Sequence, residues 1–169
     1  MTFVWTATSF CSYLTMFQIK YFPGDALVNA DIFAVCSILG CVTSAFVYKK
    51  LGVSKSFGIM FFIITVAGLN IALWGYDSMK EGNKWAFPLL VALAVYGLTS
   101  CFNLVYVTHT HIFPTLFSAT AMGICNFIAR IATCAAPEVA ETPGTTGMWI
   151  MTSLCFIALC LTFFLKLDK

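Results

Sequence analysis

The sequence predicts an all-α integral membrane protein, a six-transmembrane-helix bundle that forms a single domain over residues 1–169. Hydrophobic residues make up 60% of the chain, charged residues only 9%, and the mean hydropathy is +0.92. A soluble core of this size cannot bury so much apolar surface. The apolar residues also fall into six runs of membrane-spanning length, separated by short polar breaks. We therefore expect the lipid bilayer to surround the chain.

Each span is placed by the length of its apolar run, because a hydrocarbon core of about 30 Å requires roughly 20 helical residues. The first run follows Met1 without a basic stretch or a cleavage site, so we expect it to remain as a span. Pro114 stands where the fifth helix would begin and Pro137 where it would end. The predicted spans cover residues 3–19, 27–48, 57–75, 85–107, 114–136 and 148–165.

Lysines in the loops give the expected orientation. The side that holds both termini carries five of them: Lys49, Lys50, Lys55, Lys166 and Lys169. The opposite side has three lysines beside five carboxylates, namely Lys20, Lys80, Lys84, Asp25, Asp77, Glu81, Glu138 and Glu141. Since cytosolic loops are enriched in Lys and Arg, we expect both ends to lie inside, an N-in/C-in topology.

Several classes of function are not supported by the sequence. A net charge of +2 without a long basic run argues against nucleic-acid binding. The eight cysteines lie in apolar stretches and form no C-x-x-C pair, which indicates packing. His109 and His111 are two residues apart and would point to different faces of a helix, so we expect no metal site. Without a phosphate-binding loop or a nucleophile motif, we expect neither an enzyme nor a cofactor.

Arg130 is the one charged residue well inside a predicted span, where an unpaired charge costs several kcal/mol. It shares a face of the fifth helix with Ala119, Gly123, Asn126 and Thr133. This face would either line a hydrated cavity in which Arg130 binds an anion, or form a packing seam around the Ala119 and Gly123 pair. Two further polar stripes would wall the same cavity or only join helices: Tyr96, Thr99, Ser100 and Asn103, and Thr8, Ser12 and Thr15.

Short segments along the chain agree in order and spacing with a known family: Val4-Trp5-Thr6-Ala7-Thr8-Ser9-Phe10 with Tyr13, Lys50-Leu51-Gly52, Phe102-Asn103-Leu104-Val105-Tyr106 with Phe113-Pro114-Thr115, and Ala129-Arg130 with Ala136-Pro137. Taken in that order, these segments resemble four parts of the organic cation and anion transporters: the seventh helix, the turn between the eighth and ninth helices, the tenth helix with its following loop, and the eleventh helix. These transporters belong to the major facilitator superfamily. The resemblance covers the whole chain but only the C-terminal six-helix half of that twelve-helix family.

The resemblance implies a major-facilitator-type half that supplies one wall of a substrate path, the other wall coming from a second six-helix bundle. It also implies an organic anion as substrate, because Arg130 matches a position that the anion-transporting members keep basic. The substrate-binding residues expected on this basis are Arg130, Asn126, Asn103, Tyr106 and Tyr13.

Departures from the family pattern favour an alternative function. His111, Ser118, Val53 and Ser54 stand where the family has the charged residues of its inner gate. The alternative is a non-transporting structural or accessory subunit of a larger membrane complex, such as a mitochondrial respiratory assembly. The expected partners are a second six-helix half, a second copy of the chain or a multi-subunit complex, in the plasma membrane or the mitochondrial inner membrane.

Overall fold

The computed structural model describes residues 1–22, 26–81, 86–142 and 144–164. The regular elements in these ranges are all helical, which confirms the all-α part of the prediction. They are α1 (Thr2–Gln18), the 3-10 turn η1 (Ile19–Tyr21), α2 (Ala26–Leu51), α3 (Val53–Glu81), α4 (Ala86–Ile112), α5 (Thr115–Thr133), α6 (Ala136–Ala140) and α7 (Thr146–Phe164). The predicted boundaries at residues 85 and 165 lie outside the described residues, as do Asp25, Lys84, Lys166 and Lys169.

Within the described residues, five helices are long and apolar enough to cross a membrane, namely α2, α3, α4, α5 and α7. The chain is thus an integral membrane protein, but the prediction of six such spans is wrong by one. The helix that falls short is α1, whose 17 residues reach about 25 Å at 1.5 Å per residue. It ends at Gln18 because the chain tightens there into η1, and its many hydroxyl side chains lower its apolarity.

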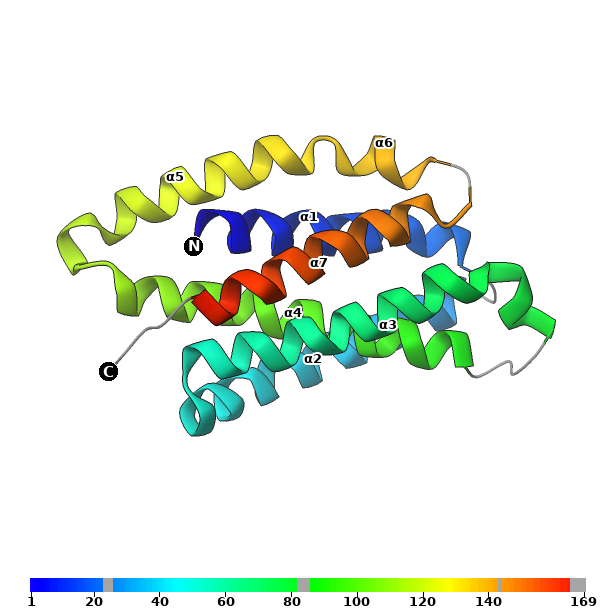
Figure 1. The fold of residues 1–169 in the computed structure, drawn as a ribbon, viewed down its shortest axis with the longest axis horizontal. Coiled ribbons are helices and arrows are strands. Elements are labelled where there is room, and N and C mark those ends of the chain that lie inside the picture. Colours follow the sequence, from blue (N-terminus) through cyan, green and yellow to red (C-terminus); the bar gives the residue numbers. More distant parts are fainter. Residues whose placement is uncertain (23–25, 82–85, 143, 165–169) are drawn as a thin grey trace.

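The long helices run alternately in opposite directions, so the start of α1 and the end of α7 lie at the same end of the bundle (Figure 1). In the middle, α3 packs against α4 and α7, while α1 packs against α4, α5, α6 and α7. Helix α5 lies along one edge of the bundle, on α1, and α2 lies on α4 toward the opposite edge (Figure 1).

The two outer helices are poorly covered by the rest of the chain. Only 11% of the apolar stretch is buried in α2 and in α5, compared with 50% in α3 and α4. The core instead comes mainly from α1, α3, α4 and α7, and its largest fully buried side chains include Trp5, Leu14, Phe57, Phe61, Ile64, Leu104, Met148 and Met151. Most of the surface of α2 and α5 is therefore left for lipid, water or another protein.

Gly52 separates α2 from α3. Its φ of +75° lies in the left-handed region, which glycine adopts without the steric cost of a Cβ. Its N–H donates to the carbonyl oxygen of Tyr48 at 3.0 Å, closing the last turn of α2. The tight reversal explains why the two helices follow one another with a single intervening residue.

The fifth predicted span ends differently from the expectation. Helix α5 stops at Thr133, three residues before the predicted boundary, and α6 then begins at Ala136. Pro137 lies in the first turn of α6, where its missing N–H costs no hydrogen bond. The proline therefore starts a short new helix, which packs against α1, instead of ending the long one.

Candidate functional site

Arg130 lies on the open side of α5 and contacts Tyr13 of α1. One guanidinium nitrogen, Nη1, donates a hydrogen bond to the hydroxyl oxygen of Tyr13. The guanidinium carbon also lies 5.2 Å from the centre of the Tyr13 ring, within the range of a cation–π contact. Arg130 itself is exposed, whereas Ala129 beside it is fully buried against the bundle. The contact therefore fixes a positive charge at the surface between α1 and α5.

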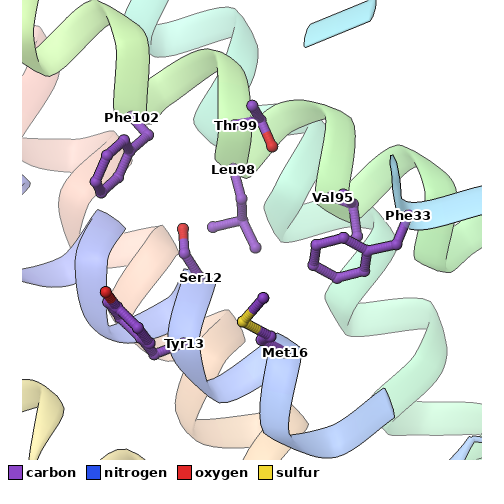
Figure 2. A pocket seen from close by; sticks show the side chains of 8 residues that line it. All are labelled: Ser12, Tyr13, Met16, Phe33, Val95, Leu98, Thr99 and Phe102. Carbon is purple, nitrogen blue, oxygen red and sulfur yellow. The ribbon is translucent and has the colours of Figure 1, made fainter. Parts of the chain in front are cut away.

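A cavity of about 330 Å³ opens between α1, α2 and α4, and we call it the α1–α4 cavity. Figure 2 shows side chains of α1 and α4 facing one another across it, with Phe33 of α2 at one end and Phe102 with Tyr13 at the other. Its lining is mostly aromatic and aliphatic, with two aliphatic hydroxyls: Ser12, Tyr13, Met16, Phe33, Val95, Leu98, Thr99 and Phe102. Such a lining suits the apolar body of a small organic ligand.

Tyr13 belongs to both features. Its side chain lines the α1–α4 cavity, and its hydroxyl accepts the hydrogen bond from Arg130. A ligand whose apolar part lies against Phe33 and Phe102 would thus find a cation beside Tyr13, at the same end of the cavity as Phe102. Because a guanidinium presents five N–H donors in a planar fork, most of them remain for a carboxylate or sulfonate.

The other predicted substrate-binding residues are not gathered around this cavity. Tyr106 packs edge-on against Trp5, with ring centres 4.9 Å apart, and contacts the cavity-lining Phe102 at 5.3 Å. Asn103 lines a different cavity, between α2 and α4, and its amide nitrogen donates to the sulfur of Cys41 at 3.1 Å. Asn126 is half-buried on α5, one turn before Arg130. The structure thus joins Arg130 with Tyr13 and places Asn103 apart from both.

The polar stripe on α4 contacts α2 at four points. Thr43 donates to the Tyr96 hydroxyl at 2.8 Å, and Ser100 donates to the carbonyl oxygen of Gly40 at 3.2 Å. Thr99 donates to the Ser37 hydroxyl, and Asn103 donates to the Cys41 sulfur. These bonds join two helices, as the packing interpretation expects, and only Thr99 of the stripe also lines the α1–α4 cavity.

The stripe on α1 is satisfied largely by the helix itself. The hydroxyls of Thr8, Ser12 and Thr15 donate to the carbonyl oxygens four residues earlier, at 2.8 Å each. Ser12 also lines the α1–α4 cavity, whereas Thr8 and Thr15 are buried in the core. Each of these two predicted stripes therefore contributes one residue to the lining of the same cavity, Ser12 from α1 and Thr99 from α4.

The polar face of α5 is largely uncovered. Ala119, Gly123 and Arg130 are exposed, and no atom outside the neighbourhood of Gly123 lies within 4 Å of the position that a Cβ would take there. The predicted small-residue pair thus forms no seam with another helix in the described part of the chain. Lipid, water or a separate protein is therefore left to cover this face.

The two histidines point to different neighbours. His109 is fully buried, with its ring stacked on Phe113 at 4.5 Å and edge-on to Trp5 at 5.4 Å. His111 is exposed and lies beside Tyr48, with ring centres 5.7 Å apart. Among the described residues, no group of three or more His, Cys, Asp or Glu side chains is arranged to hold a metal ion.

Some of the cavity lining could have been found in the sequence. Val95, Leu98, Thr99 and Phe102 recur at the spacing of one helix face, which is the signal of a shared surface. Phe33 gave no such signal, because α2 is apolar on all sides and its periodicity marks no preferred face.

Comparison of the whole chain with models of known protein families and with curated proteins finds no match.

Proposed function

We propose that the chain is one half of an organic-anion transporter and that Arg130 binds the anionic group of the substrate at the margin of the α1–α4 cavity. The contact between Arg130 and Tyr13 carries this proposal, because it holds an exposed cation next to a cavity whose lining Tyr13 shares. An aromatic carboxylate would place its ring among the apolar lining and its charge on the guanidinium.

A second bundle is part of the proposal. The chain leaves Arg130 exposed and covers little of α5, yet a charge facing acyl chains costs several kcal/mol. We expect this side to face water and a partner half, or a second copy of the chain, that closes the substrate path. The start of α1 and the end of α7 lie at the same end of the bundle (Figure 1), and we expect both in the cytosol. The plasma membrane and the mitochondrial inner membrane are both compatible with this arrangement.

Uptake of an aromatic organic anion into cells or proteoliposomes containing the chain with its co-purified partners tests the proposal. Losing a charge-assisted hydrogen bond of about 1.5 to 3 kcal/mol should lower uptake about 10- to 100-fold in Arg130→Ala. Lys55→Ala removes a similar exposed charge away from the cavity and should leave uptake unchanged. Tyr13→Phe should weaken uptake less than Arg130→Ala, because the guanidinium stays in place.

Two results would contradict the transport proposal. Equal uptake of the anion by the original protein and Arg130→Ala would remove the role of this residue. If instead the chain with its partners takes up no more organic anion than empty vesicles, transport itself is refuted. A matched organic cation serves as the control for charge selectivity.

A non-transporting subunit is the second candidate, and the outer face of α5 favours it. Ala119 and Gly123 form a shallow, uncovered strip beside the exposed Phe127, a surface against which a partner helix could pack closely. Purification in a mild detergent would then recover the chain with several unrelated membrane subunits, and Gly123→Leu would release it. Recovery of a single six-helix partner would support the transporter half.

A further inference from the structure

A second cavity, of about 390 Å³, lies between the last turns of α2 and α4, and we call it the α2–α4 cavity. Its walls include Cys41, Ser44, Tyr48, Lys49, Asn103 and Val107. It lies toward the end of the bundle that holds the start of α1 (Figure 1). The described lining combines one cation with several hydrogen-bonding groups and no carboxylate, a composition that suits an anion.

Lys49 lines the wall of the α2–α4 cavity from the last turn of α2. No ion pair joins it to a carboxylate in the part of the chain that the structure describes, and its side chain is exposed. The last turn of α2 is already closed, because the Gly52 N–H bonds the Tyr48 carbonyl oxygen. The ammonium group is thus available for a ligand that enters the cavity.

The neutral groups of the cavity have hydrogen-bonding capacity left. The Asn103 amide nitrogen donates to the sulfur of Cys41, a weak acceptor, and an amide nitrogen carries a second N–H. The Ser44 hydroxyl donates to the Cys41 carbonyl oxygen at 2.8 Å and can still accept. The Cys41 sulfur is a poor acceptor for the Asn103 amide. A phosphate oxygen near Lys49 could therefore accept a hydrogen bond from Asn103.

The surroundings of the cavity determine the kind of ligand. Both of its walls are membrane-spanning helices, and its lining includes Cys41 and Ala45 of α2, which remain exposed. The molecules next to such a lining are lipids. We propose that the α2–α4 cavity binds the anionic headgroup of a glycerophospholipid through Lys49, with an acyl chain lying along α2. This inference is independent of the transport proposal, because it involves neither Arg130 nor the α1–α4 cavity.

The basic end of a helix also attracts anionic lipid without a defined site, so the test must separate the two cases. The protein is purified in a mild detergent, mixed with phosphatidylserine or phosphatidylcholine, and the retained lipid is counted by native mass spectrometry. We expect phosphatidylserine to be retained in preference, and Lys49→Gln to lower its retention about fivefold, the loss that about 1 kcal/mol per lysine corresponds to. Lys49→Arg should keep most of it.

Lys55→Gln is the matched control, because it removes the same charge from an exposed lysine at the start of α3 that does not line the cavity. It should leave phosphatidylserine retention unchanged. Equal losses from Lys49→Gln and Lys55→Gln would mean that the basic end attracts lipid diffusely, and would overturn the proposal. Equal retention of the two lipids, or complete displacement by excess inorganic phosphate, would also overturn it, the second by showing a site for a free anion.

Discussion

Helix α2 approaches α4 closely at Gly40, and Gly40→Ala tests whether the α2–α4 contact holds the outer helix. A Cβ at this position would lie 2.9 Å from the carbonyl oxygen of Tyr96, 3.2 Å from the Ser100 hydroxyl and 3.3 Å from Cβ of Thr99. The closest of these atoms belongs to the α4 backbone and cannot rotate away. Helix α2 must therefore shift outward to accept the methyl group.

The size of the effect follows from three contributions. Overpacking at a close contact costs about 1 to 3 kcal/mol. The shift also strains the hydrogen bonds of Ser100 with Gly40 and Thr99 with Ser37, and an interhelical bond in a membrane contributes about 0.6 kcal/mol. Replacing a helical glycine by alanine returns about 0.5 to 1 kcal/mol. We expect a net loss of about 1 to 2 kcal/mol in the free energy of unfolding.

Titration with sodium dodecyl sulfate in mixed micelles, followed by the loss of tertiary structure, measures this free energy. Gly123→Ala is the matched control, because it makes the same change in a helix where a Cβ meets no atom within 4 Å. That variant should be neutral or slightly more stable than the original protein. If Gly40→Ala and Gly123→Ala unfold at the same detergent fraction, the close approach of α2 to α4 does not exist as described.

The remaining predictions use the same titration. Phe61→Ala should lower the free energy of unfolding by about 3 to 5 kcal/mol, because Phe61 is fully buried. The neighbouring Phe62 is 59% exposed, so Phe62→Ala should lower this free energy far less. Similar losses in the two variants would mean that the wrong face of α3 has been placed in the core. Gly52→Ala should cost about 1 to 2 kcal/mol, since its φ of +75° is unfavourable for any residue with a Cβ although the space around it is open. An unchanged Gly52→Ala protein would mean that the reversal after α2 does not need the left-handed conformation.

The helices were predictable because each apolar run is long and is bounded by charges, glycine or proline. The error at α1 has a physical cause: the predicted run of residues 3–19 and the observed helix Thr2–Gln18 are both 17 residues long, and a helix of that length reaches only about 25 Å. Pro137 was misjudged because a proline can begin a helix as readily as it ends one. Single residues at helix ends carry the information that an average over a span removes.

The candidate site was predictable only in part. Arg130 stood out because it is a charge inside an apolar run, but its bond to Tyr13 joins residues 117 positions apart, which no pattern within one helix indicates. Asn103 was assigned to the same path, yet the rotation of α4 turns it toward Cys41. Which face of a helix meets which neighbour depends on the assembled bundle. The contact face of α2 could still have been suggested by the small residues Ser37, Gly40, Cys41 and Ser44.

Some partners of α1 and α2 emerge late from the ribosome. Helix α2 bonds to residues about 60 positions further along the chain, and α1 bonds to α5 across 117 positions. At a synthesis rate of about 5 to 20 residues per second, α2 waits about 3 to 12 s for α4, and α1 about 6 to 23 s for α5. Throughout that interval α2 is apolar on every side and can be released into lipid alone, whereas α1 carries a row of hydroxyls and is short. Because α4 packs against both helices, we expect the short first helix to stay beside the insertion machinery at least until α4 arrives.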